Sequence, residues 1–553
     1  MWHTALVLSF LVSRISAQTW CNKNYLPGQP VVPPGGQFPT PQRSDEALLV
    51  FRCTPIISPY LEGETQGGIL VEAFTTFMQY AGAEKIVGGA VPESLDVSVT
   101  HGGKVLATGR LAVSLDSKHT AELYFTLPTL GEPRRQSYSV DCSASYGEDA
   151  QINTTSALSY LPRPSSGSVT KRDLRTGALL VGDLDKPLFP IGFYTSFDNY
   201  LASNLSILDD IKDQGFNIVH PVPTFGDLAA LERVLDRMEL LGLYLVYDMR
   251  HTYKNPEALT TEVNMIKSRP NLLLWYTSDE PDGTSEPLNV TRLAYEVIYD
   301  LDGYHPVSIV LNCADYEFTA YTEGADIVMP DTYTIANDPS FSTKYNTSCT
   351  PDFGCCGCDN CQGELEDISR RLDDFASRLD ILGWARTRGV WSVPQAFGGE
   401  EFWTRPPTGR EFAVQTILSI SHGARGIMPW IDPTPADVKS AASALAKALD
   451  QAKTFIFDPR AQFRSLQSDR VDVGMWSVGK ETLLLIANLN EQKAEVELPL
   501  PGSVSLRELV NYGVERRRFG KQGHLEVDLE PWGCAILVAH LPAVMFNAQD
   551  DEL

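Results

Sequence analysis

From about residue 186 onward, short apolar runs alternate with segments whose apolar residues recur at helical spacing. This alternation is typical of β/α units and predicts a parallel sheet. Eight runs qualify as strands, and their span from about 188 to about 430 fits the roughly 250 residues of a (β/α)8 barrel. The predicted strands are Leu188–Tyr194, Asn217–Pro221, Tyr244–Asp248, Leu272–Ser278, Val307–Leu311, Ile327–Asp331, Val390–Gln395 and Gly426–Trp430.

The helices between these strands carry recognisable end signals. Apolar residues between Leu228 and Leu241 recur on one helix face, and Gly242 then predicts the end of that helix. Thr408 and Glu411 have the spacing of a capping box, which predicts a helix that begins there and is followed by strand eight.

Two β-rich regions flank the alternating part of the chain. Alternating runs such as Leu95–Thr100, Ala121–Phe125 and Ser137–Val140 precede it, and Thr482–Ala487 and His524–Leu529 follow it. A linker rich in Pro, Ser and Gly at 161–168 marks the first boundary. The sequence predicts an α/β protein with a signal peptide at 1–17, an N-terminal antiparallel β-sandwich at 18–165, a (β/α)8 TIM barrel at 166–455, a C-terminal antiparallel β-sandwich at 456–541 and a tail at 542–553.

The fourth predicted strand ends in two adjacent carboxylates, Asp279 and Glu280. Pro281 follows them and stops the strand, because proline has no N–H to donate to a sheet. The two acids are therefore expected at the C-terminal tip of a barrel strand, which is where barrel enzymes carry their catalytic groups.

The charge of the chain narrows the classes of partner. Its formal net charge of −25 argues against nucleic acid or an anionic membrane surface. No later apolar stretch approaches the ~20 residues needed to span a bilayer. The nine histidines are scattered without the spacing of a zinc site, so neither a metal nor an organic cofactor is expected. Neutral sugars, peptides and small molecules remain open as ligands.

The first residues resemble a secretory signal. A short apolar run from Ala5 to Val12 precedes Ser16 and Ala17, where cleavage would leave Gln18 as the first residue.

Two further features agree with the secretory pathway. The last four residues, Asp550 to Leu553, are similar to the Lys- or His-Asp-Glu-Leu signals that a retrieval receptor of the endoplasmic reticulum recognises, with Asp in the first place. We expect the lumen of the endoplasmic reticulum, with secretion as the alternative. N-glycosylation sequons begin at Asn153, Asn204, Asn289 and Asn346.

The cysteines also favour an oxidising compartment. Five of them lie between residues 349 and 361, and this odd number implies a bridge out of the cluster, with Cys313 as the nearest candidate. Two of the three cysteines in the N-terminal region are expected to be bridged. The alternative for the cluster is a thiolate metal site at Cys355, Cys358 and Cys361. The disulfide candidates are Cys21, Cys53, Cys142, Cys313, Cys349, Cys355, Cys356, Cys358 and Cys361.

A barrel whose fourth strand ends in Trp-x-x-x-Asp-Glu-Pro, between two β-sandwiches, resembles the (β/α)8 glycoside hydrolases, especially clan A. The resemblance implies that Glu280 is the acid/base residue. It differs in having Asp279 where Asn is usual and Gln395 where those enzymes place a nucleophilic glutamate, with Glu400 and Glu401 only in the following loop. The adjacent Asp-Glu pair is similar to that of chitobiase-type β-N-acetylhexosaminidases, in which the Asp orients the 2-acetamido group of the substrate.

Other polar and aromatic residues at strand ends are suited to holding a sugar. Each alone has a plainer explanation, such as a buried histidine, a packed tryptophan or a structural ion pair, but their common position favours one pocket. Asp331 is the candidate nucleophile or base from strand six. The candidates for substrate binding are Tyr194, His220, Asp248, Arg250, Trp275, Tyr276, Asn312, Tyr333, Gln395, Trp430 and Asp432.

Together these observations predict a glycoside hydrolase that acts on a glycan or glycoconjugate, with Glu280 as general acid/base and Asp279 and Asp331 as its partners. The missing carboxylate at strand seven keeps a second hypothesis open, that of a lectin-like protein of the secretory pathway that binds glycans without cleaving them.

Overall fold

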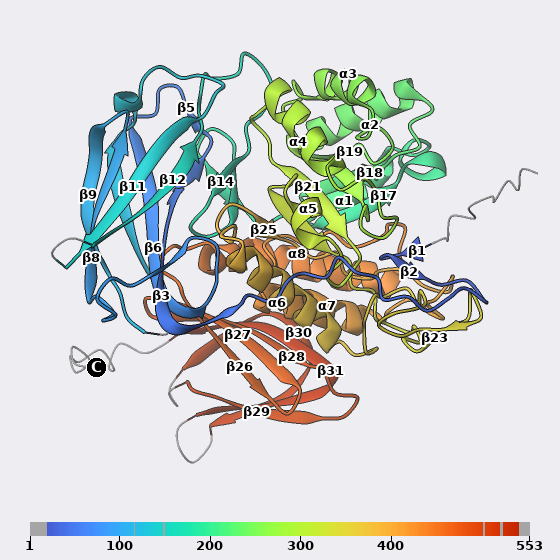
Figure 1. Cartoon of the computed structure of the whole chain (residues 1–553). Helices are drawn as coiled ribbons and strands as arrows, with labels where there is room; N and C mark the ends of the chain where they lie inside the picture. Colours follow the sequence, from blue (N-terminus) through green and yellow to red (C-terminus); the bar gives the residue numbers. More distant parts are fainter. Residues whose placement is uncertain (1–18, 116, 148–149, 501–503, 520–523, 541–553) are drawn as a thin grey trace, which may run out of the picture.

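The computed structural model describes residues 19–115, 117–147, 150–500, 504–519 and 524–540. The predicted signal peptide and the predicted C-terminal tail lie outside these residues. Within them, two groups of antiparallel strands flank a central part in which parallel strands alternate with helices (Figure 1). No helix among the described residues is both long and apolar enough to cross a membrane.

Two four-stranded antiparallel sheets form the N-terminal β-rich part, in the orders β10-β6-β3-β7 and β12-β11-β8-β9. Apolar side chains of both sheets, such as Val71 and Val140, enclose one core. The alternating runs that predicted strands here lie in β8, β10 and β11. The strands are β3 (Arg43–Pro55), β6 (Gln66–Met78), β7 (Ala83–Lys85), β8 (Ser94–His101), β9 (Lys104–Ala112), β10 (His119–Thr126), β11 (Tyr138–Tyr146) and β12 (Ala150–Leu158), with a 3-10 helix at Leu127–Leu130.

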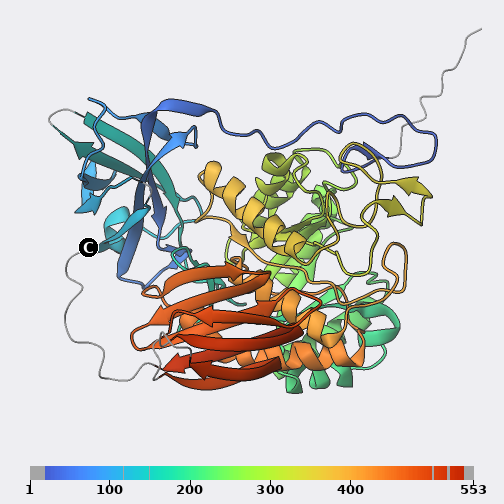
Figure 2. The ribbon, with the colours of Figure 1, turned by 90° about the horizontal axis from the view of Figure 1, so that it is seen from below.

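The first described residues do not join these sheets. β1 (Thr19–Trp20) and β2 (Lys23–Asn24) form a small hairpin on the far side of the central part. A long segment without regular structure then runs back to β3, visible as the dark-blue tube that crosses the molecule in Figure 2. The N-terminal hairpin, residues 19–24, therefore belongs in space to the central sheet and its loops.

The central sheet has seven parallel strands in the order β17-β18-β19-β20-β21-β22-β25. β19 and β21 have the predicted bounds. β17 begins four residues later than predicted, because residues 188–191 lie outside the regular ladder. The strands are β17 (Gly192–Ser196), β18 (Ile218–Val222), β19 (Tyr244–Asp248), β20 (Leu272–Asp279), β21 (Val307–Leu311), β22 (Ile327–Pro330) and β25 (Gly389–Val390).

The seventh and eighth predicted strands are less regular than expected. β25 covers only two residues, and 426–430 is not a strand, because Pro394 and Pro429 remove donors from the ladder. The backbone of residues 426–432 nevertheless pairs with segments on both sides. Ile427 makes parallel bridges to Ile191, just before β17, and to Ser392, just after β25. The segment thus lies between the first and last strands of the curled sheet.

The helices cover the outside of this sheet, and their end signals are confirmed. α2 ends at Gly242, which has the left-handed conformation (φ 63°), and α7 begins with the complete capping box of Thr408 and Glu411. The helices are α1 (Ser206–Asp213), α2 (Leu228–Leu241), α3 (Pro256–Ile266), α4 (Val290–Leu301), α5 (Phe318–Thr322), α6 (Glu366–Ile381), α7 (Gly409–Ser421) and α8 (Ala436–Ile456), with an irregular turn at Phe197–Leu201.

The C-terminal strands form one six-stranded antiparallel sheet that packs against α7 and α8 (Figure 1). β31 pairs with β29 through its first half and with β28 through its second, and both halves contribute to one core. These strands are β26 (Gln462–Ser468), β27 (Val471–Val478), β28 (Glu481–Asn488), β29 (Ala494–Leu498), β30 (Ser505–Phe519) and β31 (Leu525–His540). Short connecting strands are β4 (Ile57–Ser58), β5 (Tyr60–Leu61), β13 (Tyr160–Leu161), β14 (Lys171–Asp173), β15 (Ala178–Val181), β16 (Lys186–Leu188), β23 (Phe341–Ser342) and β24 (Thr347–Ser348).

The disulfides match part of the prediction. Cys53 pairs with Cys142, as expected for two of the three N-terminal cysteines. The expected bridge from the cluster to Cys313 is wrong: Cys313 pairs with Cys21, which the N-terminal hairpin carries to it. Within the cluster, Cys349 pairs with Cys356, and Cys358 pairs with Cys361. Cys358 and Cys361 therefore cannot serve as metal ligands. Cys355 is a free thiol.

Candidate active site

A pocket of roughly 280 Å³ opens at the C-terminal end of the central sheet. Its acids come from the ends of β20 and β22 and from the loop after β25, and its five aromatic residues come from four different segments. The lining residues are Tyr194, Asp279, Glu280, Val310, Asp331, Tyr333, Phe397, Glu400, Glu401, Trp403 and Trp430.

Asp279 and Glu280 both face this pocket, although neighbours on a strand normally point to opposite sides. The backbone of Glu280 has left and turned out of the strand, with φ at +48° in the left-handed region. A register shift between Tyr276 and Ser278 also interrupts the pairing of β20 with β21. The bulge and the turn together bring two consecutive carboxylates to one site.

Asp279 is held by two donors. Arg250 Nη1 donates to Asp279 Oδ2 at 2.5 Å, and the hydroxyl of Tyr276 donates to Oδ1. The same guanidinium binds Asp248 Oδ2 through Nε at 2.8 Å, so it bridges the two acids. These contacts fix the orientation of the Asp279 side chain.

Glu280 is paired with Asp331 through a shared amide. Asn312 Nδ2 lies 3.0 Å from Glu280 Oε1 and 3.4 Å from Asp331 Oδ1, and the two carboxyls also hydrogen bond to each other. Burial raises the pKa of Glu280, and the charge of Asp279 adds to the increase. Burial, followed by the nearby Glu280, raises the pKa of Asp331 well above its ordinary value. The pair therefore retains a proton at a pH where free carboxyls are ionised.

A histidine and an acid form the buried layer beneath the pocket. His220 Nε2 lies 2.6 Å from Asp248 Oδ2, and both side chains are fully buried. Burial lowers the pKa of His220 despite this acid, so the ring is neutral and supports the tyrosines above it. The rings of Tyr194 and His220 are 4.2 Å apart, and those of Tyr194 and Trp430 are 5.0 Å apart.

Of the candidates for substrate binding, three line the pocket and the others stand behind it or away from it. Tyr194, Tyr333 and Trp430 line it. His220, Asp248, Arg250, Tyr276 and Asn312 support the lining residues through the contacts described above.

Three candidates lie elsewhere. Trp275 points outward among the helices, where its indole donates to Asp302 at 2.9 Å, because alternation along β20 places it opposite Tyr276. Gln395 is fully buried and bonded to the backbone of Ile335. Asp432 accepts from Tyr200 and pairs with Lys439 at the outer side of the sheet.

Three aromatic residues, two in the pocket and one next to it, were not predicted from the sequence. Phe397 and Trp403 line the pocket from the loop after β25, and the density of aromatic residues in 397–403 was a usable signal. Trp20 approaches from the N-terminal hairpin, and no local pattern indicates its position.

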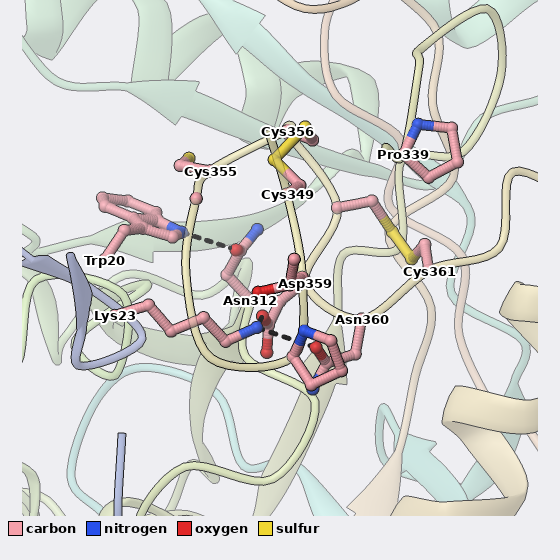
Figure 3. A pocket seen from close by; sticks show the side chains of 15 residues that line it. Trp20, Lys23, Asn312, Pro339, Cys349, Cys355, Cys356, Asp359, Asn360 and Cys361 are labelled. Carbon is pink, nitrogen blue, oxygen red and sulfur yellow. Dashed lines mark hydrogen bonds and ion pairs between the residues drawn. A yellow bond between two sulfur atoms is a disulfide. The ribbon is translucent and has the colours of Figure 1, made fainter. Parts of the chain in front are cut away.

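A second pocket of roughly 170 Å³ lies between the N-terminal hairpin and the cysteine-rich loop (Figure 3). Lys23 Nζ donates to Asn360 Oδ1 at 2.7 Å and pairs with Asp359, which ties the hairpin to that loop. Asn312 lines this pocket and also bonds to Glu280, so it stands between the two pockets.

No protein-family model matches the chain, and no curated protein matches it. Solved structures similar to it include glycoside hydrolases. They include an α-amylase from Anoxybacillus (TM-score 0.43, 14% identity, 63% of this chain and 92% of that one), a debranching enzyme from Nostoc punctiforme (0.40, 10%, 61% and 88%) and a β-galacturonidase from Eisenbergiella tayi (0.33, 14%, 70% and 65%). These TM-scores are too low to support an argument about activity, so the chemistry of this chain is inferred from the side chains of its pocket alone.

Proposed function

We propose that the protein is a glycoside hydrolase with Glu280 as its general acid. The observation that carries this proposal is a half-buried carboxyl with a raised pKa that faces a pocket walled by Tyr194, Tyr333, Trp403 and Trp430. A glycosidic oxygen needs a proton as it leaves, and an acid with a raised pKa can still hold one near neutral pH. Aromatic faces cover the apolar side of a sugar ring.

The partner acids suggest a division of roles. Asp279, which is paired with Arg250, would orient a substrate group and stabilise the positive charge that develops at the anomeric carbon. Asp331, whose pKa is raised well above its ordinary value by burial and by the nearby Glu280, would return a proton to Glu280 between turnovers. A double displacement with Asp331 as nucleophile is less favoured, because that role requires the ionised form that burial opposes.

The nucleophile would then come from the substrate. The 2-acetamido carbonyl oxygen attacks the anomeric carbon while Glu280 gives its proton to the leaving oxygen. The resulting cyclic oxazolinium ion keeps the amide proton, and its positive charge would be stabilised by Asp279. Water opens the ring, loses a proton to Glu280 and so restores both the acetamido group and the acid. This route fits Gln395, whose amide is bonded to backbone and which brings no carboxylate to the pocket. Glu400 and Glu401, which line the rim, are the alternative nucleophiles.

We also propose that residues 426–432 serve as the eighth position of a closed (β/α)8 barrel, because their backbone bonds to both edge strands. Four disulfides fit an oxidising compartment. All four sequon asparagines are exposed, which suits glycosylation in the secretory pathway: Asn153, Asn204, Asn289 and Asn346.

The test is release of nitrophenol from a panel of α- and β-glycosides by the wild type and Glu280→Gln. Activity confined to 2-acetamido sugars and lost in the variant would support the proposal. Activity on sugars without that group would instead require a nucleophile from the protein and move attention to Glu400 and Glu401. Silence across the panel together with glycan binding would favour the lectin-like alternative.

A further inference from the structure

The indole of Trp20 donates to Asn312 Oδ1 at 2.9 Å, and Asn312 Nδ2 in turn donates to Glu280 Oε1 at 3.0 Å. Figure 3 shows the first of these bonds reaching from the N-terminal hairpin into the central part of the molecule. A residue outside the barrel is therefore one hydrogen bond away from the amide that contacts the proposed acid.

An indole N–H is a donor only, so the Asn312 atom that faces it must be the oxygen. The NH₂ end of the same amide is then directed at the carboxyls of Glu280 and Asp331. If the amide turned over, its oxygen would face those carboxyls and its donors would face an indole that cannot accept. Trp20 thus selects one of the two orientations of Asn312.

The position of Trp20 is itself fixed. Its ring packs on Gly283, three residues after Glu280, so closely that a Cβ at Gly283 would lie 2.5 Å from the ring. The backbone N–H of Cys21 donates to Gly283 O at 3.0 Å. The disulfide between Cys21 and Cys313 joins the residues that directly follow Trp20 and Asn312. A covalent bond therefore keeps the two hydrogen-bonding partners in register.

We infer that Trp20 is a positioning residue that holds the Asn312 amide, and through it Glu280, in the geometry required for proton transfer. This inference rests on the proposed function of Glu280. It makes the N-terminal hairpin and its disulfide part of the active site, since no residue of the central sheet replaces the indole donor at Asn312 Oδ1 among the described contacts.

The test is Trp20→Phe, which keeps an aromatic ring on Gly283 and removes only the N–H. We expect kcat to fall about tenfold, within the hundredfold that a misplaced catalytic group costs, while KM changes less than twofold. The Asn312 bond lowers the pKa of Glu280, so its loss should move the high-pH limb of the rate profile to higher pH. Tyr25→Phe is the matched control, because it removes one polar group from the same segment without touching Asn312.

A double-mutant cycle separates positioning from general stability. In an Asn312→Ala background, Trp20→Phe should have almost no further effect, because the amide it orients is gone. Additive losses, or a Trp20→Phe variant with the kcat and pH profile of the wild type, would overturn the inference. Counting free thiols in each variant verifies that the Cys21–Cys313 bond is intact.

A carboxyl titration by NMR with labelled glutamate reads Glu280 without any substrate. A raised Glu280 pKa in Trp20→Phe supports the positioning role even if no glycoside is cleaved, in which case the proposed function alone fails. An unchanged titration in an active enzyme would refute the role of Trp20 and leave the proposed function intact.

Discussion

The segments after β20 and β25 lie at the same end of the central sheet, yet their polar side chains differ in what they contact. One faces the pocket, and the other is bonded to the backbone. After β20, the left-handed backbone of Glu280 itself turns its side chain into the pocket, where the Asn312 amide and the Asp331 carboxyl are its partners. After β25, Gln395 is fully buried, accepts from Ile335 N at 3.0 Å and donates to Ile335 O at 3.1 Å. The backbone has satisfied Gln395 and left Glu280 free to react.

Asp282 shows the same difference between an acid bonded to the backbone and an acid that faces the pocket. It lies two residues from Glu280 and burial raises its pKa to about 7, but it accepts hydrogen bonds from the backbone N–H groups of Gly283, Asn312 and Cys313. Burial alone therefore does not identify the acid. An acid with its acceptors occupied by backbone supports the loop, whereas one that faces the cavity can transfer a proton.

The largest expected effect is at Glu280. Glu280→Gln keeps the size of the side chain and removes the proton, so the rate should fall by about 10²–10⁴ with nitrophenyl substrates. Steady-state kinetics on the folded variant measure this. Glu286→Gln, in the loop after β20 and paired with Lys254 outside the pocket, should stay close to the wild type. A Glu280→Gln variant as active as this control would contradict the claim that the end of β20 carries the catalytic acid.

Asp279→Asn should lower kcat by about 10² on 2-acetamido substrates, because the charge that orients and stabilises the developing cation is lost. Asn can still accept from Arg250, so the fold around the pocket should persist. Comparison of kcat between 2-acetamido and 2-hydroxy sugars measures the effect. An equal loss on both classes would mean that Asp279 acts on the anomeric charge and does not orient the acetamido group.

Asp331→Asn should lower the peak rate by at most about tenfold, because the acid itself remains. The active form is the one in which Glu280 holds a proton, and activity falls as pH rises through the pKa of the pair. In the wild type, loss of the last proton of the pair would leave two negative charges side by side, which raises the pKa of that step. Asp331→Asn removes one of these charges, so the proton is lost at lower pH. The high-pH limb of kcat/KM should therefore move to lower pH. A limb that stays in place would show that Asp331 does not share the proton.

Gln395→Glu restores the residue type that the resemblance leads one to expect after strand seven, and it should give the smallest change in activity. Its carboxylate would face the carbonyls of Ile335 and Phe397, which now accept from the amide. We expect a loss of about 2–3 kcal/mol in the free energy of unfolding and no new activity. Gln451→Glu, exposed on α8 and bonded to Arg507, is the control for stability in urea. A stable Gln395→Glu with new activity would show that this strand end is also open to the pocket.

Local signals accounted for much of the fold. The bounds of β19 and β21, the end of α2 at Gly242 and the capping box at Thr408 follow from patterns within a few residues. The strands next to Pro394 and Pro429 were overestimated, because apolar character there reflects burial without a continuous hydrogen-bond ladder.

The site was less predictable because it depends on long-range contacts and on one local irregularity. The sequence singled out Glu280, Asp279 and Asp331, and all three line the pocket. The placement of Trp20 depends on a partner 292 residues away, and so does the pairing of Cys21 with Cys313. Trp275 was misplaced because side chains alternate along β20, so Trp275 and its neighbour Tyr276 cannot both face inward.

The most direct measurement of the role of Glu280 is the dependence of rate on leaving group. Wild type and Glu280→Gln would be compared on aryl glycosides of one sugar whose phenols range from strongly to weakly acidic. A general acid matters most for poor leaving groups, so the variant should approach the wild type on dinitrophenyl substrates and fall far behind on phenyl ones. A uniform loss across the series would contradict proton donation by Glu280 and leave it a binding residue.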